Sequence, residues 1–173
     1  IDESETSVAA SVTFEQALQL AETGSREFIQ KMGPYDFQDL VAALLRGMQY
    51  HTPLVSPPGK DGGLDIMAYR DPLGMVEPRI KVQVKHRAEV KVNAREIREF
   101  MSLLNKQGDT GLYVSTAGFT SDAIAEVRHA KFHIELLDLD DFISHWERNY
   151  DNLSDEDRAL LPLRRIAFLG PQE

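Results

Sequence analysis

The residues best placed to do chemistry lie in residues 79–86, RIKVQVKH. Apolar and polar residues alternate there, which is typical of a strand with one buried face. The polar positions include Gln83 and, two residues further on, Lys85. Because side chains repeat every two residues along a strand, both project from the same face of the sheet. An amide and an ammonium group are thus presented side by side, and their role depends on what lies opposite them.

A carboxylate is the expected partner of this pair. Residues 64–69, LDIMAY, predict a second strand, and the Pro- and Gly-containing residues 70–78 predict the loop of an antiparallel hairpin. If the hairpin folds about residue 74, Asp65 lies opposite Gln83, within a few ångströms of its side chain. The strand pattern therefore predicts a cluster of polar groups on one face of the hairpin.

Such a cluster suits the hydrolysis of a phosphodiester. Asp65 supplies a charged oxygen, Gln83 a neutral one and the Val84 backbone carbonyl a third, and hard divalent cations prefer oxygen ligands. A cation there would neutralise phosphate charge and activate water, and Lys85 would orient or deprotonate that water or stabilise the transition state. Spacing alone does not separate this hypothesis from a surface Asp beside an ordinary Gln–Lys pair, so both interpretations stay open at this point.

Composition limits the other possibilities. The chain has 173 residues, no cysteine and a formal net charge of −9. Its length suits one domain with a hydrophobic core, and the lack of cysteine excludes disulfides, thiolate zinc sites and cysteine nucleophiles. We find no signal peptide and no apolar run long enough for a membrane span, so we expect no membrane partner and a cytoplasmic location. The acidic net charge argues against a stand-alone nucleic-acid-binding protein.

The charge is unevenly distributed along the chain. Residues 79–98 hold an excess of basic residues, whereas DLDDF and SDEDR, nearer the C-terminus, are acidic. A local basic patch can attract a polyanion although the whole chain is acidic. A solvated helix face would explain the same charges equally simply. Under the first interpretation, the expected contacts to DNA phosphates are Lys81, His86, Arg87 and Lys91.

The remaining patterns predict an α/β domain. Apolar residues at helical spacing and capping residues indicate helices, and short apolar or alternating runs indicate strands. Helices are expected within residues 14–32, with a break at 23–25, and within residues 35–50, 93–108, 119–130 and 139–150, and further strands at 111–116 and 133–138. Strands that alternate with helices imply crossover connections and a mixed sheet with helices on both faces. Residues 1–12 are expected to be irregular.

The order and spacing of several sequence blocks add a resemblance. These blocks are YDFQDLVAALLRGMQY, GKDGGLDIMAY, KVQVKH, GLYVSTAGFTSDA and IELLDLDDF. They resemble the Mrr-type restriction endonuclease domain of the PD-(D/E)xK nuclease superfamily, over residues 34–145. The resemblance implies a restriction-endonuclease-like core, with a central mixed β-sheet flanked by helices, in which Asp65, Gln83 and Lys85 are catalytic. It also implies Mg²⁺ as cofactor, with Mn²⁺ as the alternative, and double-stranded DNA, methylated in many cases, as partner.

The resemblance also marks the edge of the site. In the family, an acidic residue directly follows a Phe of the first helix, whereas this sequence has Gln38 there, followed by Asp39. The departure predicts a lower catalytic rate unless Asp39 takes over that role. Gly63, in the GKDGG bend, and Thr116, before a predicted helix, complete the expected edge. We interpret Asp61 in the same bend as a turn residue.

Three segments are expected: residues 1–33 as a helical extension or linker, 34–150 as the nuclease core and 151–173 as an appended segment. The first hypothesis for function is a metal-dependent endonuclease that restricts modified DNA, with target recognition in an N-terminal region outside this sequence. The alternatives are a DNA-binding module with a weakly active or inactive nuclease fold, and a repair nuclease for branched or damaged DNA. Double-strand cleavage needs two active sites, which suits a homodimer, although the sequence reveals no interface.

Overall fold

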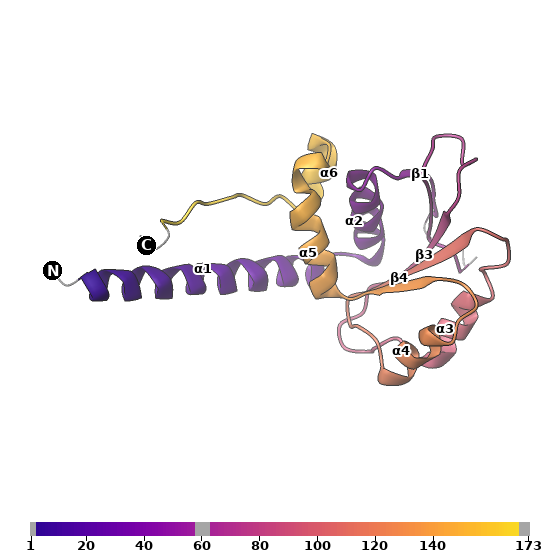
Figure 1. Ribbon diagram of the computed structural model, residues 1–173, viewed down its shortest axis with the longest axis horizontal. Coiled ribbons are helices and arrows are strands. Elements are labelled where there is room, and N and C mark those ends of the chain that lie inside the picture. Colours follow the sequence, from indigo (N-terminus) through magenta and orange to yellow (C-terminus); the bar gives the residue numbers. More distant parts are fainter. Residues whose placement is uncertain (1–2, 58–62, 170–173) are drawn as a thin grey trace.

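The order of helices and strands follows the sequence pattern closely (Figure 1). The computed structural model describes residues 3–57 and 63–169, with the backbone alone for residues 3–12, so the predicted turn at Asp61 lies outside the described residues. The elements are α1 (Glu3–Lys31), α2 (Pro34–Gly47), β1 (His51–Val55), β2 (Ile66–Tyr69), β3 (Arg79–Lys85), α3 (Ala94–Met101), β4 (Asp109–Ser115), α4 (Ser121–Arg128), β5 (Ile134–Leu137), α5 (Leu139–Asn149), the 3₁₀ helix η1 (Tyr150–Asn152) and α6 (Asp155–Leu160).

A five-stranded sheet with the strand order β1-β2-β3-β4-β5 lies at the centre. β2 runs antiparallel to both of its neighbours, β1 and β3, whereas β3, β4 and β5 run parallel to one another. Parallel neighbours require crossover connections, and α3 and α4 provide them. The predicted α/β fold with a mixed sheet is therefore confirmed.

The two faces of the sheet are covered by different helices. Val82 of β3 belongs to the larger hydrophobic cluster, which α2 and α5 complete. Tyr113 of β4 belongs to the second cluster, beneath α3 and α4, together with Phe100. Because strand residues alternate between faces and Gln83 pairs with Tyr113, Gln83 and Lys85 lie on the α3 side. The polar face of β3 is thus turned towards α3.

The helix α1 is continuous, so the predicted break at residues 23–25 is wrong, and the predicted irregularity of residues 1–12 is wrong for residues 3–12, while residues 1–2 lie outside the described residues. Gly24 is exposed, and a glycine costs a helix about 1 kcal/mol relative to alanine without ending it. The N-terminal part of α1 extends away from the sheet, and the segment after α6 runs in the same direction, towards the N-terminal part of α1 (Figure 1). The rings of Phe14 and Phe168 meet edge to face there, with centroids 5.2 Å apart.

The helix α3 is shorter than the predicted helix over residues 93–108, because it ends at Met101. Its start agrees with the sequence, since the Asn93 side chain caps it. The chain that follows is held by Asp109, whose carboxylate accepts two backbone N–H groups of the loop after α3. Lys81 Nζ lies 2.9 Å from the same carboxylate. This ion pair holds the loop after α3 against the sheet.

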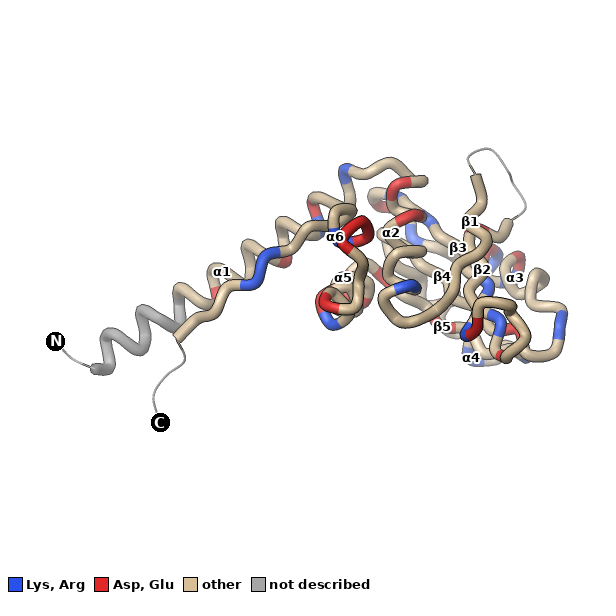
Figure 2. The backbone as a smooth tube through the Cα atoms, turned by 90° about the horizontal axis from the view of Figure 1, so that it is seen from above, with Lys and Arg blue, Asp and Glu red and all other residues tan. Residues whose placement is uncertain are grey.

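Charged residues are separated in space as they are in sequence. The first turn of α6 carries Asp155, Glu156 and Asp157, and α6 lies beside α5 and α2, away from α3 (Figure 2). The face of β3 that is turned towards α3 instead carries lysines and an arginine. No helix within the described residues combines the length and apolar character that a membrane span needs.

Candidate active site

The β2–β3 hairpin brings the predicted catalytic residues together. Ile66 pairs with Val82, and one residue earlier the Asp65 backbone N–H donates to the Val82 carbonyl at 2.9 Å. Asp65 therefore lies directly before β2 and opposite Gln83, in the register that the sequence predicted. Gly63 adopts a φ of +72°, a conformation that favours glycine, where the chain turns away from β3. The hairpin pairing thus ends at Asp65.

The Asp65 carboxylate is held by β3. Its Oδ2 accepts the Val84 backbone N–H at 2.6 Å and the Gln83 side-chain amide at 3.3 Å. Burial raises the pKa of Asp65, while the Val84 hydrogen bond and the positive charge of Lys85 act in the opposite direction. Lys85 is two residues from Gln83 on β3, so its side chain projects from the same face as the Gln83 amide that contacts Asp65. Asp65, Gln83 and Lys85 therefore converge on one face of the hairpin.

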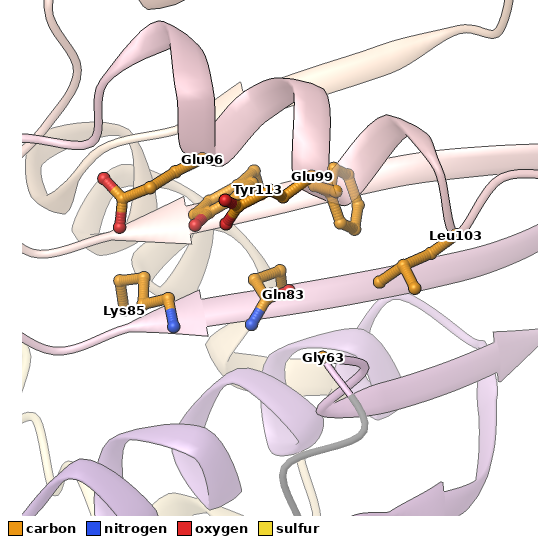
Figure 3. A pocket seen from close by; sticks show the side chains of 8 residues that line it. Gly63, Gln83, Lys85, Glu96, Glu99, Leu103 and Tyr113 are labelled. Atoms are coloured by element: carbon orange, nitrogen blue, oxygen red, sulfur yellow. The ribbon is translucent and has the colours of Figure 1, made fainter.

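A pocket of about 300 Å³ opens between β3 and α3 (Figure 3). Gln83 and Lys85 line it from β3, and Glu96 and Glu99 line it from α3. Tyr113 of β4 completes the side that faces Gln83 and Lys85 (Figure 3). The pocket therefore combines one cationic side chain, two carboxylates and two uncharged polar groups.

The two carboxylates from α3 already have partners. Glu96 accepts hydrogen bonds from Arg87 at 2.6 Å and from the backbone N–H of the helix cap at 3.1 Å. Burial opposes the ionisation of Glu96, but these hydrogen bonds and the charges of Arg87 and Lys85 hold its pKa below the usual value. Glu99 forms an exposed ion pair with Arg95 at 2.9 Å. Arg87, a predicted phosphate contact, is thus neutralised at the edge of the pocket.

Tyr113 is a pocket residue that the sequence patterns did not single out. It pairs with Gln83 in the parallel β3–β4 register, and its ring packs edge-on against Phe100 and Phe119, with centroids 5.2 Å and 5.9 Å away. Burial raises the pKa of the Tyr113 hydroxyl, so that it stays protonated. The signal in the sequence is its place in the strand GLYVST, but the pairing of that strand with β3 was needed to put it beside Gln83.

The oxygen atoms expected to hold a metal lie together. Val84 directs its N–H at Asp65, and a strand residue points its N–H and C=O to the same edge, so the Val84 carbonyl faces Asp65 too. The Gln83 amide nitrogen is turned to Asp65 Oδ2, which leaves the amide oxygen for another partner. Within the described residues, no group of three or more His, Cys, Asp or Glu side chains is placed to hold a metal. One charged and two neutral oxygens fit a hard cation, and weak binding is expected without further ligands.

Gln38 and Asp39, both predicted at the edge, differ in their surroundings. Gln38 is 6% exposed and donates its Nε2 to the Ser56 carbonyl at 2.8 Å. The Ser56 backbone N–H in turn donates to the Asp65 carbonyl at 2.8 Å. Asp39 is exposed on α2. Gln38, and not Asp39, therefore supports the backbone on which Asp65 is placed.

Two further predicted residues hold the chain after β3. Thr116 Oγ1 accepts the Arg87 backbone N–H and donates to the Arg87 carbonyl, both at 2.8 Å. His86 Nε2 lies 2.8 Å from the Ile29 carbonyl, and its ring packs against Phe37 at 5.4 Å. These contacts join the end of β3 to β4, α1 and α2, and so fix the path of the chain at the site.

The remaining predicted phosphate contacts are Lys81 and Lys91. The Lys81 side chain is 12% exposed and is engaged by Asp109, which also pairs with Arg79 at 3.2 Å. Lys91 is exposed, and no ion pair with it is found in the part of the chain that the structure describes. Contacts of these lysines with DNA stay a prediction, and Lys91 is the better placed of the two.

The fold defines a restriction-endonuclease-like class. The structure is similar to the restriction endonuclease MspJI in complex with a 27-mer oligonucleotide, with a TM-score of 0.62, 16% identity and coverage of 88% of this chain and 38% of that chain. It is similar to the DNA modification-dependent restriction endonuclease AspBHI, with a TM-score of 0.61, 20% identity and coverage of 80% and 38%. At these identities the likeness shows the fold alone, and the match spans less than half of each endonuclease.

The sequence places the chain within a family. The Mrr_cat family model, described as a restriction endonuclease, matches residues 29–146. The chain therefore belongs to the Mrr_cat restriction endonuclease family, which confirms the resemblance noted in the sequence blocks. A search of curated proteins gives no match.

Proposed function

We propose that this domain is a metal-dependent DNA endonuclease that acts in the restriction of modified DNA. The observation that carries the proposal is the convergence of Asp65, Gln83 and Lys85 where the hairpin pairing ends. Membership of a restriction endonuclease family supports the DNA substrate. Modified DNA as the target is supported by the shared fold with AspBHI, which is described as modification-dependent.

The proposed roles follow from the placement of the groups. Asp65, the Gln83 side chain and the Val84 carbonyl would hold the cation, for which we propose Mg²⁺. When bound, the cation would neutralise charge on the scissile phosphate and favour attack by water. The Lys85 ammonium, beside Asp65, would donate to the phosphate or to the attacking water and offset the charge that develops there.

A DNA-binding module with little cleavage activity is the second candidate. The observation that favours it is the single carboxylate of the core set, Asp65, together with the amide of Gln38 where the family has an acid. A hard cation gains most from charged ligands, so such a site would hold Mg²⁺ weakly. The two candidates differ in whether phosphodiester bonds are broken once DNA and Mg²⁺ are both present.

Plasmid cleavage tests the proposal. The substrates are an unmodified plasmid, the same plasmid carrying 5-methylcytosine, and a branched duplex, each incubated with Mg²⁺ or EDTA. We expect cleavage of the modified plasmid that requires Mg²⁺ and is lost in Asp65→Asn. The matched control is Asp155→Asn, which removes a carboxylate of α6 that is 99% exposed. This variant should cleave the plasmid as the wild type does.

Each other outcome of this experiment has a defined meaning. Cleavage in EDTA, or cleavage by Asp65→Asn at the wild-type rate, would contradict the roles assigned to the site. Binding of DNA without cleavage of any substrate would support the second candidate. Preference for the branched duplex would identify a repair nuclease.

A further inference from the structure

We propose that Tyr113 is a further catalytic residue, whose hydroxyl donates a hydrogen bond to the scissile phosphate in the pocket between β3 and α3. The inference rests on the proposed function, because it requires a phosphodiester bound at Asp65 and Lys85. It assigns a role to a side chain outside the predicted catalytic set of Asp65, Gln83 and Lys85.

Tyr113 continues the row of site residues across three strands. Asp65 lies opposite Gln83, and Gln83 pairs with Tyr113 in the next strand. Neighbouring strands are about 4.8 Å apart, so the Cα atoms of Asp65 and Tyr113 are separated by about 10 Å. A phosphate held at Asp65 projects its oxygens over Gln83, within reach of a side chain as long as tyrosine. Figure 3 shows Tyr113 facing the pocket across from Gln83 and Lys85.

The ring of Tyr113 is fixed, whereas its hydroxyl lacks a partner in the part of the chain that the structure describes. The residue is 1% exposed, and Phe100 and Phe119 pack edge-on against its ring. The hydroxyl reaches the pocket, where water can contact it when the pocket is empty. A hydroxyl at the wall of a pocket can find that partner in a bound molecule, and the rigid ring would hold it in one position for this contact.

Lys85 is the group of this pocket that favours an anion as that partner, whereas the charges of Glu96 and Glu99 oppose one. Glu96 and Glu99 line the same pocket, but Arg87 and Arg95 already pair with them. A tyrosine hydroxyl ionises only near pH 10, so at neutral pH it offers a proton to an acceptor. Phosphate oxygens are strong acceptors, and Lys85 would draw the same phosphate from the β3 side. The hydroxyl would therefore stabilise developing charge without transferring a proton.

The test compares Tyr113→Phe with Tyr69→Phe in the full chain. Phenylalanine keeps the ring and removes only the hydroxyl. The control removes a hydroxyl that contacts the Met67 sulfur at 3.8 Å and does not line the pocket. The measurements are the single-turnover rate of plasmid cleavage in Mg²⁺, the Kd for a fluorescent duplex in EDTA, and the melting temperature. For Tyr113→Phe we expect a rate lowered by about a hundredfold with an unchanged Kd, since loss of one donor to a transition state costs about 100- to 1000-fold.

The outcomes separate this inference from the proposed function. Wild-type protein that cleaves none of the substrates overturns the proposed function and, with it, the role of Tyr113. Wild-type protein that cleaves while Tyr113→Phe cleaves equally fast overturns the role of Tyr113 alone. A loss of rate that is matched by a loss of duplex affinity or by a lower melting temperature assigns Tyr113 to the integrity of the fold and also overturns the inference.

Discussion

Gln38→Glu tests whether α2 can contribute a charged ligand to the site. Gln38 is 6% exposed, and its amide nitrogen donates to the Ser56 carbonyl at 2.8 Å. A carboxylate at this position has no proton to donate, so the Ser56 carbonyl loses its partner and faces a negative charge. The new charge is separated from the backbone of Asp65 by Ser56, whose N–H donates to the Asp65 carbonyl, and a cation at Asp65 would offset it. We therefore expect the variant to be less stable without metal and to regain stability when Mg²⁺ is added.

The loss of stability without metal and its recovery with Mg²⁺ should be similar in size. Leaving a buried hydrogen-bond group without a partner costs about 1–3 kcal/mol. For a domain of this size, each kcal/mol lowers the melting temperature by about 2–4 °C, so a fall of roughly 2–12 °C is expected in EDTA. A metal present at 100 times its Kd returns about 2.7 kcal/mol, which is enough to offset most of that loss. The wild type, which has fewer charged ligands, should gain less from Mg²⁺ without DNA.

Thermal unfolding in EDTA and over a range of Mg²⁺ concentrations measures both effects. The matched control is Gln30→Glu, the same substitution at an exposed position of α1, which should change neither stability nor its dependence on Mg²⁺. Unchanged stability of Gln38→Glu in EDTA would refute the role of the Ser56 hydrogen bond. A loss that Mg²⁺ does not reverse would show that the side chain at position 38 does not reach the metal.

Three further predictions concern charged residues. Lys85→Ala should lower the plasmid cleavage rate at least about a hundredfold and leave the melting temperature nearly unchanged; cleavage at the wild-type rate would remove Lys85 from the mechanism. Asp109→Asn should cost about 3–5 kcal/mol in urea unfolding, because it breaks a buried pair with Lys81. Burial opposes the ionisation of Asp109, but the hydrogen bond from Lys81 and other contacts lower its pKa. The stabilisation by the Asp109 carboxylate is therefore present above the unfolded pKa of about 3.9 and is lost as the pH falls through the folded pKa. The stabilities of wild type and variant should therefore converge in acid. Lys91→Ala should flatten the log–log salt dependence of duplex binding by about 0.9, and an unchanged slope would place the DNA elsewhere.

The hairpin and its register could be predicted because their causes are local. Alternation fixes which side chains share a face, and Gly74, with a φ of +66°, lies in the loop about which the hairpin folds. With the loop located, the pairing of Asp65 with Gln83 follows by counting residues along the two strands. The candidate site could therefore be assembled from the sequence before the positions of the helices were known.

The pocket and the end of α3 could not be predicted, because both depend on contacts between distant segments. The residues after Met101 form a loop that Asp109, on the next strand, binds through two N–H groups, and Asp109 also pairs with Lys81. Tyr113 enters the site through the parallel pairing of β3 with β4, which no local pattern specifies. Lys81 likewise appeared to be a free cation in the sequence, and its buried partner was revealed only by the fold.

Asp65 links the fold to the chemistry of the site. Its Oδ2 takes the place of a backbone carbonyl as the acceptor for the Val84 N–H, and Oδ1 is the oxygen that the same carboxylate would offer to a cation. Burial raises the pKa of Asp65, and a nearby positive charge favours its ionised form, so cation binding and ionisation of Asp65 support each other. A second carboxylate at position 83 would repel the first, whereas the amide of Gln83 does not. A cation bound at this site would be short of negative ligands, and we expect a phosphate of DNA to supply the missing charge.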